Sequence, residues 1–162
     1  MDICKNLQER FNLITREEYR NCSNLSNTTK KILCDIGLPK EPLKFIQFNI
    51  EEIENIKLDK EHIIIGNDFG ANICINCKDE IVAIDFENEY PKRFVNKNLE
   101  TFLKFIIIYL SYEDKINVAD DDEINQVIQE IRKKFDMIDV KSLSNEENWW
   151  AIVLEQIECG LM

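Results

Sequence analysis

Residues 62–86, HIIIGNDFGANICINCKDEIVAIDF, carry the pattern that decides the fold. Polar and apolar side chains alternate from Asn72 to Cys77, and a period of two residues is typical of a β-strand. Only a few residues separate this segment from the apolar runs on either side of it. Such short connections leave no room for crossover helices, so the strands are expected to pair mainly antiparallel. We predict strands at 63–66, 72–77 and 80–86, a first strand at 43–48 and a short last one at 94–95.

Helical patterns follow these strands. Asn98 is placed to cap a helix whose apolar stripe runs from Leu99 to Leu110. Asp120 to Glu123 put negative charge on the first turn of a second helix, and Arg132 to Lys134 are expected at its C-terminal end, where they would complement the helix dipole. A last helix is expected to begin with a capping box and to end at a glycine; these residues are Ser144, Glu147 and Gly160.

Helical patterns also precede the strands. Residues 1–27 predict a loosely packed N-terminal helix followed by a polar linker. A second helix, capped by Thr28 or Thr29, is expected to run through Cys34 and to stop at Gly37. One block of strands with helices before and after it predicts a single α+β domain over residues 1–162. Its mainly antiparallel central sheet would be flanked by the N-terminal and C-terminal helices and covered on one face.

The composition is that of a folded and strongly acidic protein. Hydrophobic residues make up 44% and charged residues 31% of the chain, close to the globular norm. The 31 acidic and 20 basic residues give a net charge of -11, with no Lys/Arg-rich tract to offset it. Because phosphates demand clustered cations, we expect no nucleic-acid ligand. The charge favours a cationic partner and a monomeric state, although solubility alone would explain it equally well.

The sequence predicts a cytoplasmic protein. The longest apolar runs, such as Phe105 to Leu110, are far shorter than the roughly 18 residues of a membrane span. The first residues lack the basic and apolar regions of a secretory signal. The six cysteines are therefore expected to remain thiols and not to form disulfides.

Residues with catalytic potential are sparse. His62 is the single histidine, so a Ser-His-Asp or Cys-His device would depend on it, and its position at a strand edge favours a structural role. Cys74 and Cys77 have the spacing of a zinc half-site or a redox pair, but residues three apart on a strand point to opposite faces. We therefore expect no metal or other cofactor. Gly66 and Gly70 predict a turn in which glycines adopt positive φ, because a phosphate loop would carry a lysine and lead into a helix.

Two further features bear on binding. Acidic runs such as Asp120 to Asp122 could serve acid-base chemistry by residue type, but a solvated acidic rim is the commoner explanation. The Trp149 and Trp150 side chains point about 100° apart on a helix. One ring is therefore expected in the core, and the other at the helix edge or in a partner surface.

Several short motifs occur in a distinctive order. They are Ile36-Gly-Leu-Pro39 ahead of Phe45-Ile-Gln-Phe48, Ile63-Ile-Ile-Gly66 with the acidic turn at 68–70, the strands at 73–77 and 81–85, and Phe94-Val-Asn96 ahead of Leu99-Glu-Thr-Phe102. In this order they resemble the SUKH superfamily of bacterial immunity proteins, which also includes a fungal cell-wall regulator. The resemblance covers residues 28–112 best. Residues 113–162 are expected to form the C-terminal helices, of which the one with Trp149 and Trp150 fits the branch of the superfamily that has a tail helix.

The resemblance implies a non-enzymatic immunity protein that neutralises a polymorphic toxin, often a nuclease or deaminase, by direct binding inside the cell. An acidic protein suits a toxin that is basic where it holds nucleic acid. A regulatory or scaffold module that recognises a host protein is the alternative, and an unrecognised hydrolase comes third. The carboxylates expected to face a basic toxin are Glu51, Glu52, Glu54, Asp59, Glu61, Glu87, Glu89, Asp120, Asp121, Asp122 and Glu123.

Overall fold

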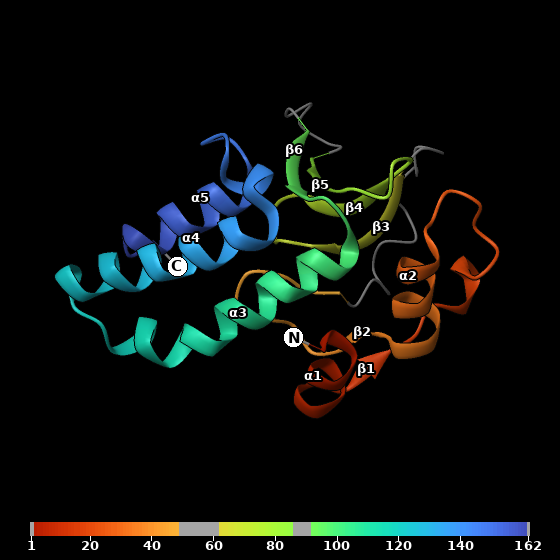
Figure 1. Ribbon diagram of the computed structural model, residues 1–162, viewed down its shortest axis with the longest axis horizontal. Coiled ribbons are helices and arrows are strands. Elements are labelled where there is room, and N and C mark those ends of the chain that lie inside the picture. The colour runs from red at the N-terminus through yellow and green to blue at the C-terminus, as the bar shows by residue number, and fades with distance from the viewer. Residues whose placement is uncertain (1, 49–61, 86–91, 162) are drawn as a thin grey trace.

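The computed structural model describes residues 2–48, 62–85 and 92–161 of the chain (Figure 1). Within these residues, four consecutive strands form one antiparallel sheet in which each strand pairs with the next along the chain. The strands are β3 His62–Asn67, β4 Asn72–Asn76, β5 Ile81–Ile84 and β6 Arg93–Asn96. The predicted α+β class with an antiparallel central sheet is confirmed.

Both faces of this sheet carry buried side chains. Alternate residues, such as Ile73 and Ile75 of β4, belong to the main hydrophobic core that the sheet shares with the helices. Side chains from three strands, Ile64, Cys74 and Val82, form a smaller buried cluster on the opposite face. The expectation that only one face is covered is therefore wrong, because the side chains of both faces are closed off from water.

Three helices follow the sheet and lie beside it in Figure 1. They are α3 Leu99–Val118, α4 Asp121–Asp139 and α5 Trp149–Glu158. The predicted cap of α3 is confirmed, because Asn98 accepts a hydrogen bond from the Thr101 backbone N–H at 2.9 Å. The predicted acidic start of α4 is found as well, and there Asp120 is the cap itself and forms a capping box with Glu123. In the described part of the chain, no helix combines the length and the hydrophobicity that crossing a membrane requires.

The end of α4 differs from the prediction. The helix continues to Asp139, so Arg132 to Lys134 lie inside it and its last turn carries no basic side chain. Their expected role as a complement to the helix dipole is therefore wrong. Phe135 is buried in the main core and Ile138 packs against it, so apolar contacts extend the helix past the basic residues.

The start of α5 also differs. Ser144 and Glu147 do not form the predicted capping box, because the Ser144 hydroxyl donates to the Lys141 carbonyl at 2.9 Å. This bond closes a short 3-10 turn, Val140–Leu143, and α5 begins only after Asn148. The predicted end of α5 is confirmed, since the Leu161 N–H returns to the Gln156 carbonyl while Gly160 adopts φ 66°.

The N-terminal segment is packed more tightly than expected. Helix α1, Ile3–Arg10, leads to strand β1, Leu13–Ile14, which pairs antiparallel with β2, Leu38–Pro39. Leu7 and Leu25 are both buried in the main core. Residues 2–27 are therefore part of the folded domain and not a loose extension of it.

The second helix starts earlier than predicted. Ser26 caps α2, Asn27–Lys30, by accepting the Thr29 N–H at 3.1 Å, whereas the Thr29 hydroxyl donates to Asp79. A π-helical segment, Lys31–Ile36, continues α2 and ends at Gly37, which has φ 99°. The predicted glycine stop is confirmed, since this left-handed conformation favours glycine.

Residues 43–48 do not form the predicted strand. The Leu43 N–H donates to the Ile46 carbonyl at 2.8 Å and turns the chain, and Gln47 pairs with Asn67 of β3 in an isolated bridge. The turn places the Phe45 ring 4.7 Å from Tyr109 and 5.7 Å from Trp150. Burial of the Phe45 side chain thus outweighs the strand propensity of the sequence and determines the local conformation.

Trp150 lies at the centre of an aromatic core. Its side chain is 0% exposed, and its indole N–H donates to Asn96 Oδ1 of β6 at 2.8 Å. Ring centroids between 4.8 and 6.1 Å away belong to Phe45, Phe102, Phe105, Phe135 and Trp149. The prediction that one tryptophan is in the core is confirmed, and the second, Trp149, is buried as well.

The predicted positive φ at Gly66 and Gly70 is wrong, because Phe69 is the residue of this turn that adopts it, at φ 68°. Gly66 is required for a different reason. A Cβ atom there would lie 2.5 Å from the backbone oxygen of Gln47, which pairs with the neighbouring Asn67 at the end of β3. A Cβ atom on Gly70 would meet only a carboxylate oxygen of Asp68, at 3.8 Å.

We expect Gly66→Ala to lower the free energy of unfolding by about 1 to 3 kcal/mol, because the backbone must shift to admit the methyl group. Gly70→Ala, four residues away in the same turn region, is the matched control and should change it by less than about 0.5 kcal/mol. Urea denaturation followed by tryptophan fluorescence measures both values. Equal stability of the two variants would contradict the close approach of Gln47 to β3.

Candidate partner-binding hollow

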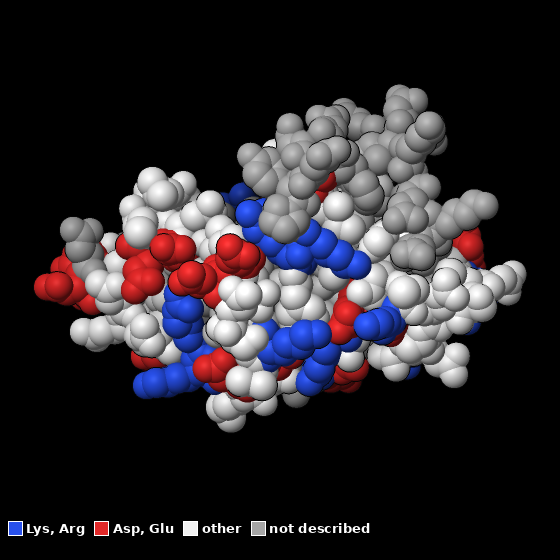
Figure 2. Space-filling view, turned by 90° about the horizontal axis from the view of Figure 1, so that it is seen from above, with Lys and Arg blue, Asp and Glu red and all other residues white. Residues whose placement is uncertain are grey.

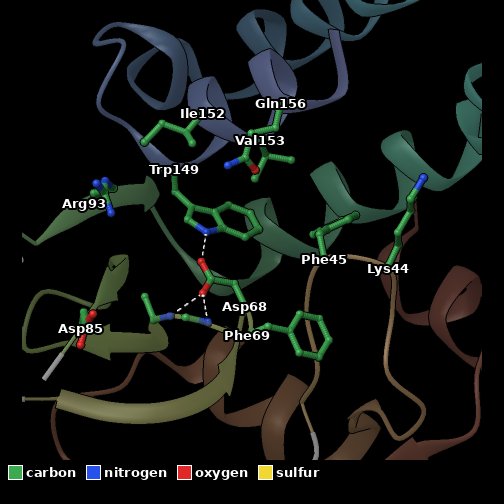
Figure 3. A pocket seen from close by; sticks show the side chains of 12 residues that line it. Lys44, Phe45, Asp68, Phe69, Asp85, Arg93, Trp149, Ile152, Val153 and Gln156 are labelled. Atoms are coloured by element: carbon green, nitrogen blue, oxygen red, sulfur yellow. Dashed lines mark hydrogen bonds between the residues drawn. The ribbon is translucent and has the colours of Figure 1, made fainter. Parts of the chain in front are cut away.

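A hollow of about 550 Å³ opens beside the aromatic core, between α5 and the turn that joins β3 to β4 (Figure 3). Four separate parts of the chain form its walls: the turn at 43–48, the β3–β4 turn, the ends of β5 and β6, and α5. Its volume lies in the range of sites that receive a ligand or a partner's side chains. Residues that line it include Lys44, Asp68, Phe69, Arg93, Trp149 and Ile152.

Asp68 organises this site. Its Oδ1 accepts hydrogen bonds from the backbone N–H groups of Gly70 at 3.1 Å and Ala71 at 2.6 Å, which closes the turn. Its Oδ2 accepts the indole N–H of Trp149 at 2.6 Å, as the dashed lines in Figure 3 mark. One carboxylate therefore joins the β3–β4 turn to the first residue of α5, through charge-assisted hydrogen bonds.

Phe69 is held at the tip of the turn with 63% of its surface exposed. Its φ of 68° is uncommon for a bulky residue and costs about 1 to 3 kcal/mol. The Asn67 side chain offsets part of this cost by accepting the Phe69 N–H at 3.2 Å. An exposed aromatic ring on a hydrogen-bonded turn is typical of an interface anchor.

The carboxylates that line the hollow have interaction partners, whereas the cations do not. Both oxygens of Asp68 accept hydrogen bonds, from the turn and from Trp149, and Asp85 also has an interaction partner. No hydrogen bond or ion pair joins the side chains of Arg93 or Lys44 to another residue of the described chain, and the buried Arg93 Nε lacks an acceptor. The hollow therefore offers two cationic side chains, Arg93 and Lys44, with which an anionic group of a partner could pair.

The acidic residues predicted to face a partner are described only in part. Asp120 Oδ1 accepts the N–H groups of Asp122 at 3.1 Å and Glu123 at 2.9 Å, so Asp120 caps α4. The side chains of Asp120, Asp122 and Glu123 are all exposed. Figure 2 shows acidic side chains at the end of the molecule where α3 meets α4. Outside the described residues lie Glu51, Glu52, Glu54, Asp59, Glu61, Glu87 and Glu89.

The residues weighed for catalysis or metal binding are dispersed. His62 begins β3, and its Nε2 lies 2.9 Å from Lys92 Nζ. Cys74 is buried within β4 and Cys77 is exposed after it, and burial raises the pKa of the Cys74 thiol to about 12. Across residues 2–48, 62–85 and 92–161, no group of three or more His, Cys, Asp or Glu side chains is placed to hold a metal ion.

A comparison with models of protein families matches residues 20–156 to the SUKH-4 immunity proteins. The chain belongs to this family. The matched segment contains the whole sheet, α3, α4 and most of α5, so the SUKH resemblance drawn from the ordered motifs is confirmed. Searches among curated proteins and among solved structures found no match.

The hollow of this SUKH-4 protein was missed by sequence reasoning, which assigned residues 66–70 to a turn and gave Lys44 and Arg93 no role. One local signal was present. Phe69 stands between Asp68 and Gly70, at the tip of a hairpin where turn chemistry favours small or polar residues. Arg93 carried no such signal, because its neighbours in the hollow come from distant parts of the chain.

A double-mutant cycle should detect the bond between Asp68 and Trp149. We expect Asp68→Ala and Trp149→Phe to be coupled by about 1 to 3 kcal/mol in the free energy of unfolding, because each removes one partner of a charge-assisted hydrogen bond. Trp150→Phe is the matched control, since its indole N–H binds Asn96, and its coupling with Asp68→Ala should stay below about 0.5 kcal/mol. Equal coupling in the two cycles would show that the bond does not hold α5.

The thiols should differ in reactivity. Because alkylation requires the thiolate and the pKa of Cys74 is raised, iodoacetamide near neutral pH should label Cys77 well before Cys74. Mass spectrometry of the peptides measures both rates, and labelling in denaturant provides the control in which the difference disappears. Labelling of Cys74 as fast as Cys77 in the native protein would contradict the burial of Cys74.

Proposed function

We propose that this SUKH-4 protein neutralises a cognate polymorphic toxin by binding it directly, without catalysing a reaction. The single observation that carries the proposal is the family match over residues 20–156. The hollow supports it by offering what a protein interface uses: an exposed aromatic anchor, apolar walls and a rigid hydrogen-bonded frame. Binding would block the toxin by covering its active surface.

The toxin is proposed to be a basic nuclease or deaminase domain. The net charge of -11 would attract such a domain over a distance, which raises the association rate more than it changes the dissociation rate. Three exposed carboxylates at the start of α4 are members of the proposed steering set whose side chains the structure describes: Asp120, Asp122 and Glu123. Their position at a helix N-terminus means that they also stabilise α4.

Binding kinetics with a candidate toxin domain, produced with an inactivating substitution, tests the proposal. Raising the salt concentration from about 0.1 M to about 1 M shortens the Debye length from about 10 Å to about 3 Å. We expect the association rate to fall at least about tenfold over this range, with a smaller change in the dissociation rate. Asp122→Asn should lower the association rate at low salt and leave it unchanged at high salt.

Two controls separate steering from folding. Asp120→Asn removes a charge but keeps a good helix cap, because asparagine and aspartate cap equally well. The melting temperature of each variant shows whether α4 is intact. Absence of binding to the toxin domain would overturn the proposed function, whereas tight binding with a salt-independent association rate would overturn only the electrostatic part.

A further inference from the structure

Arg93 is a charged side chain whose partner is missing from the described chain. It lies on β6, paired across the sheet with Ala83 of β5, and it lines the hollow. Its Nε is buried without an acceptor, and its guanidinium forms no hydrogen bond or ion pair with any residue described. A partly buried guanidinium without an acceptor is unfavourable, so a partner that supplies one would gain binding energy here.

Two unpaired cations in the hollow contrast with the net charge of the whole protein. Lys44 lies on the opposite side of the hollow from Arg93 in Figure 3 and is likewise unpaired within the described residues. The chain has a net charge of -11, and Asp68 and Asp85 line the same hollow, yet no described carboxylate forms an ion pair or a hydrogen bond with either cation. A partner's anionic group could therefore pair with Arg93, although the long-range field of the protein favours a cationic partner.

The surroundings favour a carboxylate on a protein segment over a free anion. Phe69 projects from the turn at 63% exposure, and Ile152 and Val153 of α5 line the same hollow. An acidic side chain could place its carboxylate on the planar guanidinium while the residues beside it cover these apolar groups. Exclusion of water around the pair would strengthen it.

We propose that Arg93 binds an Asp or Glu side chain of the toxin, with Phe69 packing against the segment that carries it. This inference rests on the proposed function, because the occupant is the toxin domain. The acidic surface and Arg93 then have different roles. The acidic surface attracts the basic toxin and mainly raises the association rate, whereas Arg93 holds one carboxylate of the bound toxin and mainly lowers the dissociation rate.

The test uses the same inactivated toxin domain and measures both rates. Arg93→Met removes the charge but keeps an apolar stem of similar length, so the packing around β6 is retained. We expect it to raise the dissociation rate about 30-fold or more with little change in the association rate. Lys40→Ala, which removes an exposed positive charge that does not line the hollow, is the matched control and should change either rate by less than about twofold.

Charge reversal then identifies the carboxylate. Arg93→Glu should abolish binding to the parent toxin domain, and an Asp→Arg or Glu→Arg substitution at one acidic position of the toxin should restore it. Phe69→Ala should also raise the dissociation rate. Arg93→Glu and Phe69→Ala should each keep the melting temperature of the parent protein. A toxin domain that binds the parent, Arg93→Met and Lys40→Ala with the same kinetics would overturn this inference and leave the proposed function standing. Failure of the parent to bind would overturn the proposed function itself.

Discussion

Burial of the Trp150 ring is the constraint on which the rest of the structure depends. The ring contacts aromatic side chains of α3, α4 and the turn at 43–48, and its indole N–H must find an acceptor once water is excluded. Asn96 supplies that acceptor from the end of β6, and its own amide donates to the buried carboxylate of Asp139 at 3.2 Å. This chain of bonds ties the sheet to the end of α4 and to α5, so the layers cannot slide past one another.

The hollow follows from this arrangement. With Trp150 in the core, the next ring along the helix points about 100° away and reaches the β3–β4 turn, where Trp149 donates to Asp68. The same carboxylate holds the turn that keeps Phe69 in its left-handed conformation. A structural carboxylate thus holds the turn that presents Phe69, and its oxygens are directed to the turn and to Trp149, so it forms no ion pair with Arg93.

Much of the fold could be predicted because its signals are local. The alternation around β4, the cap at Asn98, the acidic start of α4 and the glycine stops at Gly37 and Gly160 each depend on residues within a turn or two of one another. The order of these elements follows directly from the order of their motifs in the sequence, and the SUKH resemblance could therefore be recognised from the sequence. Local signals failed for the end of α4, where apolar contacts and not charge decide where the helix stops.

The sequence by itself thus determined the antiparallel sheet, its flanking helices, the overall negative charge and the family. Only the tertiary structure decided which charges stay unpaired and where a partner could bind. The bond between Asp68 and Trp149 spans 81 positions in sequence, and the walls of the hollow extend from Lys44 to Gln156. Periodicity and capping rules act over one or two turns, so they hold no information on which distant side chains meet. The backbone contact that requires Gly66 arises in the same way, from a segment that β3 meets only after folding.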